Sequence, residues 1–372
     1  MKSPFDNPAI VRGFSNDGRV YVRPILAAAA GPQPRLTFEY CEIMVRDRGG
    51  IATATGSRAA LADWADREGG PLGHATASWL ERLQTPPPPA AGFAFDRLLV
   101  MGVLNVTPDS FSDGGRYLSP VAAIAHGRAL AEAGADIVDI GGESTRPGAS
   151  PVAADVELAR VAPVIEGLSG LAALSIDSRH AAVVERAVVL GAGLINDVSA
   201  LTSDPASMAT AAAAGVPVIL MHAQGDPRTM QNDPTYEHPA LDVYDFLEAR
   251  IAACEAAGMP RARLIADPGI GFGKTRDHNI EILHRLSLFH GLGCPLAVGL
   301  SRKRLIANLS AGEPVEHRLP GSLAGALWAI SQGVHIVRVH DVTETCQAVA
   351  VWQALSRGAW HGDSHARGSG GA

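Results

Sequence analysis

Polar side chains that can bind or activate a substrate recur along this chain, each close behind a short apolar run. Asp177, Asn196 and Asp267 offer carboxylate or amide groups that suit a flat heterocycle with adjacent N–H groups. Cationic or N–H donor groups suited to an anion such as phosphate come from Arg146, Arg302, Lys303, Arg338 and His340. Together the two sets predict a substrate with a donor-rich ring at one end and phosphate at the other.

The elements that must position these side chains follow a regular pattern after residue 92. Runs rich in Val, Ile and Leu alternate with Ala-rich helical stretches, as in βα units around a parallel sheet. Strands are predicted at residues 98–105, 137–141, 174–177, 194–197, 217–222, 264–267, 296–299 and 335–339. Helices are predicted to begin near residues 120, 152, 180, 204, 240, 277, 319 and 342.

Eight such units in about 260 residues predict an α/β fold of the TIM (β/α)8 barrel type. The carboxyl ends of all eight barrel strands meet at one mouth, where barrel active sites lie. The residues at or just after these ends are, in order, Asn105; Asp139 and Glu143; Asp177; Asn196 and Asp197; His222; Asp267; Ser301, Arg302 and Lys303; and Arg338, His340 and Asp341. Capping of the following helices is the alternative, but it accounts poorly for eight polar strand ends out of eight.

The chain before the barrel has a different composition. Residues 84–92, QTPPPPAAG, contain four consecutive prolines and predict an extended linker. Residues 1–83 predict a small α+β extension of unknown role, with strands at 19–26 and 35–45 and helices at 56–67 and 74–83. The barrel is expected at 93–358 and a flexible tail at 359–372. Because every barrel strand follows the linker, a chain starting at Gly92 is expected to fold and act alone.

Charge, hydropathy and cysteine spacing narrow the functional class. The net charge of −7 and the lack of a basic run argue against a nucleic-acid partner. No apolar run reaches about 18 residues and no secretory signal is visible, so a cytoplasmic protein that does not enter a membrane is expected. The four cysteines are scattered without a C-x-x-C pair and are expected to be reduced thiols: Cys41, Cys254, Cys294 and Cys346.

Two glycine-rich segments imitate nucleotide-binding motifs. DPGIGFGKT resembles a Walker A loop, but Pro268 stands where that motif needs its first glycine. The glycines at 191 and 193 are followed by Leu-Ile-Asn and do not complete G-x-G-x-x-G. Neither a P-loop nor a Rossmann site is therefore predicted.

Seven segments between residues 97 and 357 closely resemble those of the dihydropteroate synthases, the pterin-binding folate-pathway enzymes that sulfonamides inhibit. They are MGVLNVTPDSFSDGG (101–115), DIGGESTRPGA (139–149), INDVSA (195–200), LMHAQGDPRTMQ (220–231), DPGIGFGKT (267–275), GLSRKRLI (299–306) and IVRVHDV (336–342). The resemblance implies a TIM-barrel transferase, expected to be a homodimer. With Mg²⁺, it joins 6-hydroxymethyl-7,8-dihydropterin pyrophosphate to p-aminobenzoate, giving 7,8-dihydropteroate and pyrophosphate. Sulfonamides would compete for the site.

The resemblance also implies roles for individual residues. Asp177, Asn196 and Asp267 would hold the polar edge of the pterin, and Lys303 would hold its ring carbonyl oxygen. Phe272 would lie against the ring. Asn105 would ligate Mg²⁺, which prefers oxygen donors. The pyrophosphate and p-aminobenzoate sites would be built from Thr145, Arg146, Pro147, Ser301, Arg302, Arg338 and His340, and the catalytic set would be Asn105, Lys303, Arg338 and His340.

The residue types favour a mechanism without a covalent enzyme intermediate. An aniline nitrogen is a weak nucleophile, and no motif places a Ser–His or Cys–His pair. Loss of pyrophosphate first, leaving a cation on the exocyclic methylene, is therefore expected. A pterin-binding methyltransferase domain that works with a corrinoid protein is one alternative, but it would not need the pyrophosphate-binding residues. A catalytically silent relative is another, disfavoured because the first two motif loops are complete.

Overall fold

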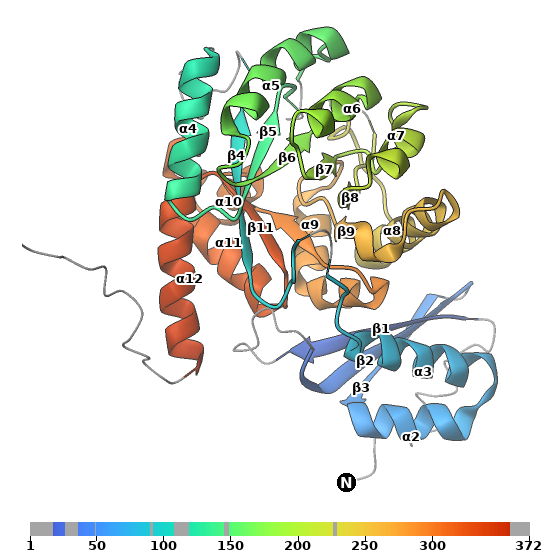
Figure 1. The fold of residues 1–372 in the computed structure, drawn as a ribbon. Coiled ribbons are helices and arrows are strands. Elements are labelled where there is room, and N and C mark those ends of the chain that lie inside the picture. The colour runs from blue at the N-terminus through green and yellow to red at the C-terminus, as the bar shows by residue number, and fades with distance from the viewer. Residues whose placement is uncertain are drawn as a thin grey trace, which may run out of the picture.

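The strands that follow residue 92 form one parallel sheet that curls into a barrel (Figure 1). The computed structural model describes residues 18–26, 36–48, 50–89, 92–107, 119–144, 149–225 and 229–357. The barrel strands are β4 (Leu99–Asn105), β5 (Ile137–Gly141), β6 (Ala173–Asp177), β7 (Leu194–Asp197), β8 (Val218–Met221), β9 (Leu264–Asp267), β10 (Ala297–Gly299) and β11 (Ile336–Val339). Their order is β10-β11-β4-β5-β6-β7-β8-β9, and a parallel bridge between Ala266 and Leu296 brings the two edges together.

Helices surround this barrel. They are α4 (Pro120–Glu132), α5 (Ala154–Leu168), α6 (Ala181–Val189), α7 (Ser207–Ala214), α8 (Pro239–Ala256), α9 (Arg276–His284), α10 (Arg304–Leu309), α11 (Leu319–Ser331) and α12 (Val342–Arg357). Short 3₁₀ turns lie at η2 (Arg261–Arg263), η3 (Leu286–Leu292) and η4 (Val315–His317). The predicted TIM barrel is confirmed, and α10 is an element that the sequence pattern did not indicate. None of the described helices combines the length and apolar character needed to cross a membrane.

Apolar side chains fill the barrel interior and separate it from an outer core. The inner cluster is made of Phe95, Leu99, Met101, Ile137, Leu194, Ile219, Ile265, Ala297 and Ile336. Phe95 precedes the first barrel strand, and its ring stands edge-on to His335, which precedes the last. These residues fill the barrel at the end where its strands begin, so the other end is left for polar side chains.

The N-terminal extension is a three-stranded antiparallel sheet followed by two helices. Its elements are β1 (Arg19–Leu26), β2 (Phe38–Asp47), β3 (Gly50–Ser57), α2 (Arg58–Glu68) and α3 (Gly70–Gln84). The α+β class, two of the strands and both helices were predicted, but β3 was not. Its sequence, GIATATGS, contains only one large apolar residue, so its strand character depends on pairing with β2.

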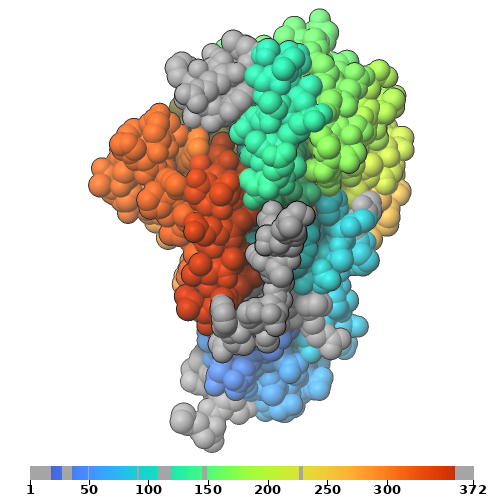
Figure 2. Space-filling model, turned by 60° about the vertical axis from the view of Figure 1, so that its left-hand side comes forward, coloured from blue at the N-terminus to red at the C-terminus, as the bar shows by residue number. Residues whose placement is uncertain are grey.

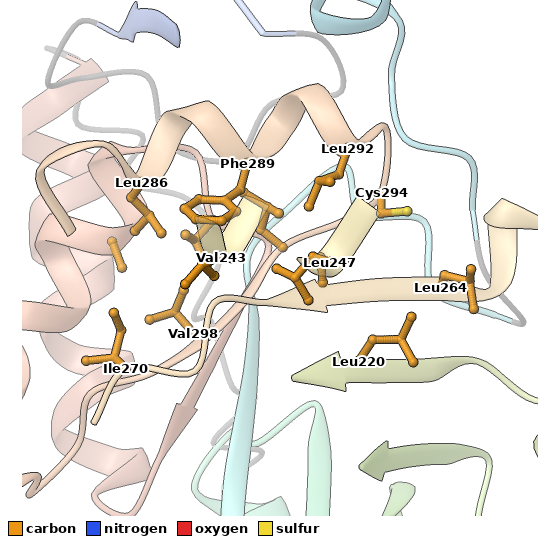
Figure 3. Close-up of a cluster of buried hydrophobic side chains, with 14 of the residues drawn as sticks. Leu220, Val243, Leu247, Leu264, Ile270, Leu286, Phe289, Leu292, Cys294 and Val298 are labelled. Carbon is orange, nitrogen blue, oxygen red and sulfur yellow. The ribbon is translucent and has the colours of Figure 1, made fainter. Parts of the chain in front are cut away.

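The extension lies below the barrel in Figures 1 and 2 and packs against α8 and η3. Aromatic rings make the contact. Trp79 of α3 stacks on Tyr244 of α8 with ring centroids 5.0 Å apart, and Tyr21 of β1 meets the same ring edge-on at 5.8 Å. A Cβ atom at Gly291 in η3 would lie 1.8 Å from the Trp79 ring, so only glycine fits there. Behind this contact, Phe289 of η3 and Leu247 of α8 belong to a buried cluster that continues toward the barrel strands (Figure 3).

Polar contacts surround the same junction. Arg19 pairs with Asp245 (2.9 Å) and with Glu248, and Arg46 pairs with Asp242 (2.6 Å). The Tyr21 hydroxyl donates to an Asp245 oxygen at 2.9 Å. The extension and the barrel therefore share one hydrophobic core, bordered by ion pairs to a row of acidic residues on α8.

Candidate active site

The predicted site residues of the described segments come from different strands and meet at the carboxyl end of the barrel. Parallel pairing sets Gly141 of β5 beside Asp177 of β6, and Asp177 beside Asn196 of β7. Asp267 ends β9, and Arg338 lies near the end of β11. The predicted residues Thr145, Arg146 and Pro147 lie outside the described segments.

Arg338 joins two carboxylates across the mouth. Its Nε donates to Asp139 Oδ2 at 2.6 Å and its Nη2 donates to Asp177 Oδ2 at 2.7 Å. Asn196 also donates to Asp139 Oδ2, at 3.0 Å. Burial opposes the charge of Arg338, but the two carboxylates outweigh it and raise its pKa, so the guanidinium stays charged. Burial likewise raises the pKa of Asp177 to about 7, although Arg338 pulls it down.

Asp267, Lys303 and Phe272 form the opposite wall. Asp267 Oδ1 accepts from the Gly269 N–H at 2.7 Å, and within the described residues Oδ2 has no hydrogen-bond partner. Lys303 Nζ donates to the Ile270 carbonyl at 2.5 Å and lies 4.8 Å from the centre of the Phe272 ring. Burial lowers the pKa of Lys303 to about 8, with Asp267 opposing the shift. This wall offers a carboxylate oxygen, an ammonium group and an aromatic face.

The predicted residues after β10 and β11 are connected to one another. Ser301 Oγ accepts from the His340 N–H at 3.1 Å and lies 3.0 Å from its Nδ1. The Arg302 guanidinium donates from Nε to Asp341 Oδ2 at 3.0 Å, and Arg302 has a left-handed backbone with φ of 59°. The structure therefore brings Ser301, Arg302 and His340 together, with Arg302 held by Asp341.

Two groups of acidic and amide side chains contain oxygen or nitrogen atoms that could bind a metal ion. A Cβ atom at Gly141 would lie 3.6 Å from both Asn105 Oδ1 and Asp177 Oδ2, so two oxygen donors of the kind that Mg²⁺ prefers lie near each other. Glu143, Glu157 and His180 also converge within 4.8 Å. There, Arg179 and the Val152 N–H engage both Glu143 oxygens, and burial raises the pKa of Glu157 to about 8. In the first group, Asp177 Oδ2 also accepts from Arg338 at 2.7 Å, so Asn105 Oδ1 is the remaining candidate ligand of that pair.

Lys274 is a buried residue that the sequence analysis left without a role. It belongs to DPGIGFGKT, a segment that shares the family resemblance, but neither that resemblance nor the comparison with the Walker A motif gave this lysine a role. Its ammonium lies 2.8 Å from His222 Nδ1, and 2.9 and 3.0 Å from the carbonyl oxygens of Gly269 and Phe272. The available signal was a lysine inside a glycine-rich segment at a strand end, but its partners are mostly carbonyl oxygens, which no side-chain pattern reveals.

Comparison with known proteins gives consistent results. A sequence family described as "Pterin binding enzyme" matches residues 101–340. The chain is 48% identical over 257 residues to dihydropteroate synthase of Escherichia coli (strain K12), covering 68% of this chain and 90% of that protein. The enzyme of Neisseria meningitidis serogroup B is 45% identical over 266 residues, covering 70% of this chain and 93% of its own.

Solved structures of such enzymes have the same fold. Yersinia pestis dihydropteroate synthase with a sulfonamide drug complex superposes with a TM-score of 0.68 and 45% identity, over 71% of this chain and 95% of that one. The Xanthomonas albilineans enzyme in complex with 7,8-dihydropteroate gives a TM-score of 0.63 and 45% identity, over 70% and 94% of the two chains. The same enzyme with 4-aminobenzoic acid gives 0.66 and 48%, over 70% and 93%.

Proposed function

Because this chain belongs to the dihydropteroate synthase family of pterin-binding enzymes, we propose that its barrel mouth performs the family's reaction through the residues described above. The enzyme is a transferase that joins 6-hydroxymethyl-7,8-dihydropterin pyrophosphate to p-aminobenzoate, with 7,8-dihydropteroate and pyrophosphate as products. The observation that carries the assignment of roles is the wall formed by Asp267, Lys303 and Phe272. It presents an acceptor, a donor and an aromatic face side by side, which matches the polar edge and the flat surface of a pterin.

The pterin ring lies, in this proposal, between that wall and the side of the mouth that carries Asp177 and Asn196. Asp267 Oδ2 accepts from the ring N–H and amino groups, and Lys303 donates to the ring carbonyl oxygen. Asn196 and Asp177 hold the remaining polar edge. The burial of Asp177 and Asp267, each 7% exposed, supports this arrangement. A hydrogen bond to a charged acceptor is stronger where water is excluded, so buried carboxylates distinguish well between ligands with and without matching N–H groups.

The pyrophosphate is bound, in this proposal, by Arg338 and His340. Nε and Nη2 of Arg338 are bound to Asp139 and Asp177, while within the described residues Nη1 has no partner. We assign Nη1 and His340, with Arg146, to the leaving anion. Ser301 and Arg302 shape the p-aminobenzoate site together with Thr145 and Pro147, and this is the site at which sulfonamides would compete.

Mg²⁺ belongs to the proposal as the metal of this family, and Asn105 would hold it. Asn105 Oδ1 is an oxygen donor of the kind that a hard cation takes, whereas Arg338 holds Asp177 Oδ2. When bound, Mg²⁺ supplies positive charge that offsets the charge of the pyrophosphate. Removal of divalent cations with EDTA is expected to stop turnover and to leave the affinity for a pterin without phosphate unchanged.

The bond to pyrophosphate breaks first in the proposed mechanism. The C–O bond between the methylene and the pyrophosphate gives its electron pair to the oxygen, and the dihydropterin ring stabilises the cation that remains. Arg338 and His340 hold the anion, while the carboxylates of Asp177 and Asp267 favour the cation. The amine of p-aminobenzoate then forms the C–N bond and loses a proton.

Isotope exchange tests this order. With Mg²⁺ and pterin pyrophosphate but no p-aminobenzoate, oxygen-18 placed in the bridge between the methylene and phosphorus should scramble into non-bridging positions. Water should slowly trap the cation and release hydroxymethylpterin. Arg338→Ala should suppress both signals, because the anion loses a charged partner. If both are undetectable while turnover with p-aminobenzoate is fast, displacement is concerted.

A cytoplasmic homodimer completes the proposal. The four cysteines are free, and Cys41, Cys254 and Cys294 are buried, as suits a reducing compartment. Exposed apolar side chains on the adjacent helices α11 and α12, Trp328 (46%), Val351 (56%) and Leu355 (78%), offer a surface that a second copy could cover. Sedimentation velocity of the purified chain tests the dimer, since a monomer at micromolar concentration would contradict it.

A further inference from the structure

The loop that connects β9 to α9 has an unusually complete set of side-chain contacts. This β9–α9 loop, residues 268–275, follows Asp267 and carries Phe272. Seven consecutive carbonyl oxygens, from residue 269 to residue 275, each accept a hydrogen bond from a side chain. In order, the donors are Lys274, Lys303, Gln231, Lys274, Tyr236, Asn279 and Asn279. An irregular segment is thereby held in one conformation, although it has no sheet or helix ladder.

Lys274 makes two of these contacts from inside the loop. Its side chain is buried, and Nζ donates to the carbonyl oxygens of Gly269 (2.9 Å) and Phe272 (3.0 Å). The third partner is Nδ1 of His222, at 2.8 Å. A fourth and longer contact, of 3.3 Å, goes to the carbonyl oxygen of His222. Burial lowers the pKa of Lys274, and Asp267 opposes the shift. Four acceptors around Nζ favour the charged form, and its three N–H donors are all used within this set. Lys274 therefore has no donor left for a substrate.

His222 can serve as an acceptor because its ring is neutral. Burial and the neighbouring charge of Lys274 lower the pKa of His222 to about 2. A neutral imidazole that accepts at Nδ1 carries its proton on Nε2. Since His222 directly follows β8, the ammonium links the β9–α9 loop to the end of the neighbouring strand.

Two glycines show how closely the loop approaches the chain after β8. A Cβ atom at Gly269 would lie 1.8 Å from the carbonyl oxygen of His222, and one at Gly273 would lie 2.2 Å from that of Gln224. Both glycines have left-handed backbones, with φ of 66° and 59°. The backbones are therefore in direct contact on either side of the ammonium, which occupies the space between them.

We infer that Lys274 is a positioning residue for pterin binding, whose ammonium replaces a bound cation and holds the β9–α9 loop so that Asp267 and Phe272 face the ring. This rests on the proposed roles of those two residues. Two loop carbonyls, the His222 carbonyl and one imidazole nitrogen around a single positive charge form the kind of cradle that a small monovalent cation would occupy. Here the chain supplies the cation itself.

Chemical rescue tests the inference. Lys274→Ala removes the atoms from Cγ to Nζ, and n-propylammonium supplies the same atoms. We expect the dissociation constant of a pterin, measured by calorimetry, to rise about ten- to hundred-fold. The KM for p-aminobenzoate should change less than threefold. n-Propylammonium should restore most of the pterin affinity, whereas tetramethylammonium, which has the charge but no N–H donor, should not.

Control variants separate positioning from folding. Lys274→Met keeps most of the stem and the fold but lacks the donors, so it should also bind pterin at least ten-fold more weakly. Arg276→Ala, which removes an exposed cation from the same region, should bind pterin normally. If Lys274→Met, or folded Lys274→Ala, binds pterin within threefold of the unaltered protein, Lys274 serves stability alone and the inference is wrong.

Thermal unfolding tests the cation cradle without relying on the roles proposed for Asp267 and Phe272 in pterin binding. n-Propylammonium should raise the unfolding temperature of Lys274→Ala but not that of the unaltered protein, whether or not pterin is present. If it does not, the cation cradle is wrong. If it does, and Asp267→Asn binds pterin normally, the error lies in the role proposed for Asp267.

Discussion

At the scale of single residues, Asp267 has one oxygen held by the loop and one available to a ligand. Asp267→Asn retains an acceptor for the Gly269 N–H and replaces the second oxygen with a donor. Hydrogen bonds to charged groups are worth about 1.5–3 kcal/mol, so pterin affinity should fall roughly ten- to hundred-fold. Calorimetry measures the affinity, and an unchanged thermal transition is the control. Unaltered affinity would refute the role of Asp267 at the ring edge.

Glu157 gives the stability of the fold a pH dependence. Its side chain is fully buried, Oε2 accepts from Ser178 Oγ at 3.0 Å, and Oε1 has no partner among the described residues. Burial raises its pKa to about 8, against about 4.3 in an unfolded chain. Between these values the folded state holds a proton that the unfolded state has lost. The stabilisation present at low pH is therefore lost as the pH rises toward 8.

Glu157→Gln keeps a neutral group at all pH values. Urea unfolding should show a flatter pH profile between pH 5 and 8, and at higher pH the variant should exceed the unaltered protein by on the order of a few kcal/mol. Glu185→Gln on the exposed face of α6 serves as the control. Parallel profiles for Glu157→Gln and the unaltered protein would show that Glu157 is not protonated in the fold.

The sequence could predict which residues gather at the mouth, but not how they pair. Polar residues at strand ends share a site because parallel strands end on the same side of a barrel. The partners of Arg338 lie 199 and 161 residues away, and their pairing depends on barrel closure and rotamers. Lys274 was missed because three of its four partners are backbone oxygens.

At the scale of elements, the barrel was predictable because each unit repeats the same buried-strand and Ala-rich-helix pattern. Each barrel strand lies within about one residue of its predicted bounds. β3 and α10 were not predicted because neither has a clear apolar periodicity. β3 is defined by its pairing with β2, and α10 is only six residues long.

Trp79 is the element-scale test of the junction between the extension and the barrel. It is 4% exposed, stacks on Tyr244 and covers Gly291. Trp79→Ala leaves a cavity between α3, α8 and η3 and should cost about 3–5 kcal/mol of unfolding free energy. Tyr40→Ala, at a half-exposed tyrosine of β2 in the same extension, should cost much less. Equal effects in denaturant titrations would mean that the junction contributes little.

At the scale of the whole molecule, the structure changes one expectation about the extension. From the sequence, a chain starting at Gly92 was expected to fold alone. The shared core and the ion pairs of Arg19 and Arg46 indicate instead that truncation would expose Tyr244 and leave the acidic row of α8 without partners. The truncated chain should unfold at a lower temperature and aggregate, as measured by scanning calorimetry and light scattering.

A full-length Arg19→Ala, Arg46→Ala variant separates the two contributions. Loss of exposed or half-buried ion pairs costs little, so this variant should remain soluble. A truncated barrel with an unchanged unfolding temperature and no aggregation would restore the original expectation. The extension would then be an appendage that contributes nothing to barrel stability.

The junction also imposes an order of events on the ribosome. The extension is synthesised first, yet Asp245, which accepts from the Tyr21 hydroxyl, lies 224 residues further along the chain. At roughly 5–20 residues per second, the gap lasts about 10–45 s, during which Tyr21 lacks its partners on α8, and Trp79 lacks the Tyr244 ring for most of that time. The nascent chain thus carries exposed aromatic rings through much of its synthesis, which makes it a natural client for chaperones that act during translation.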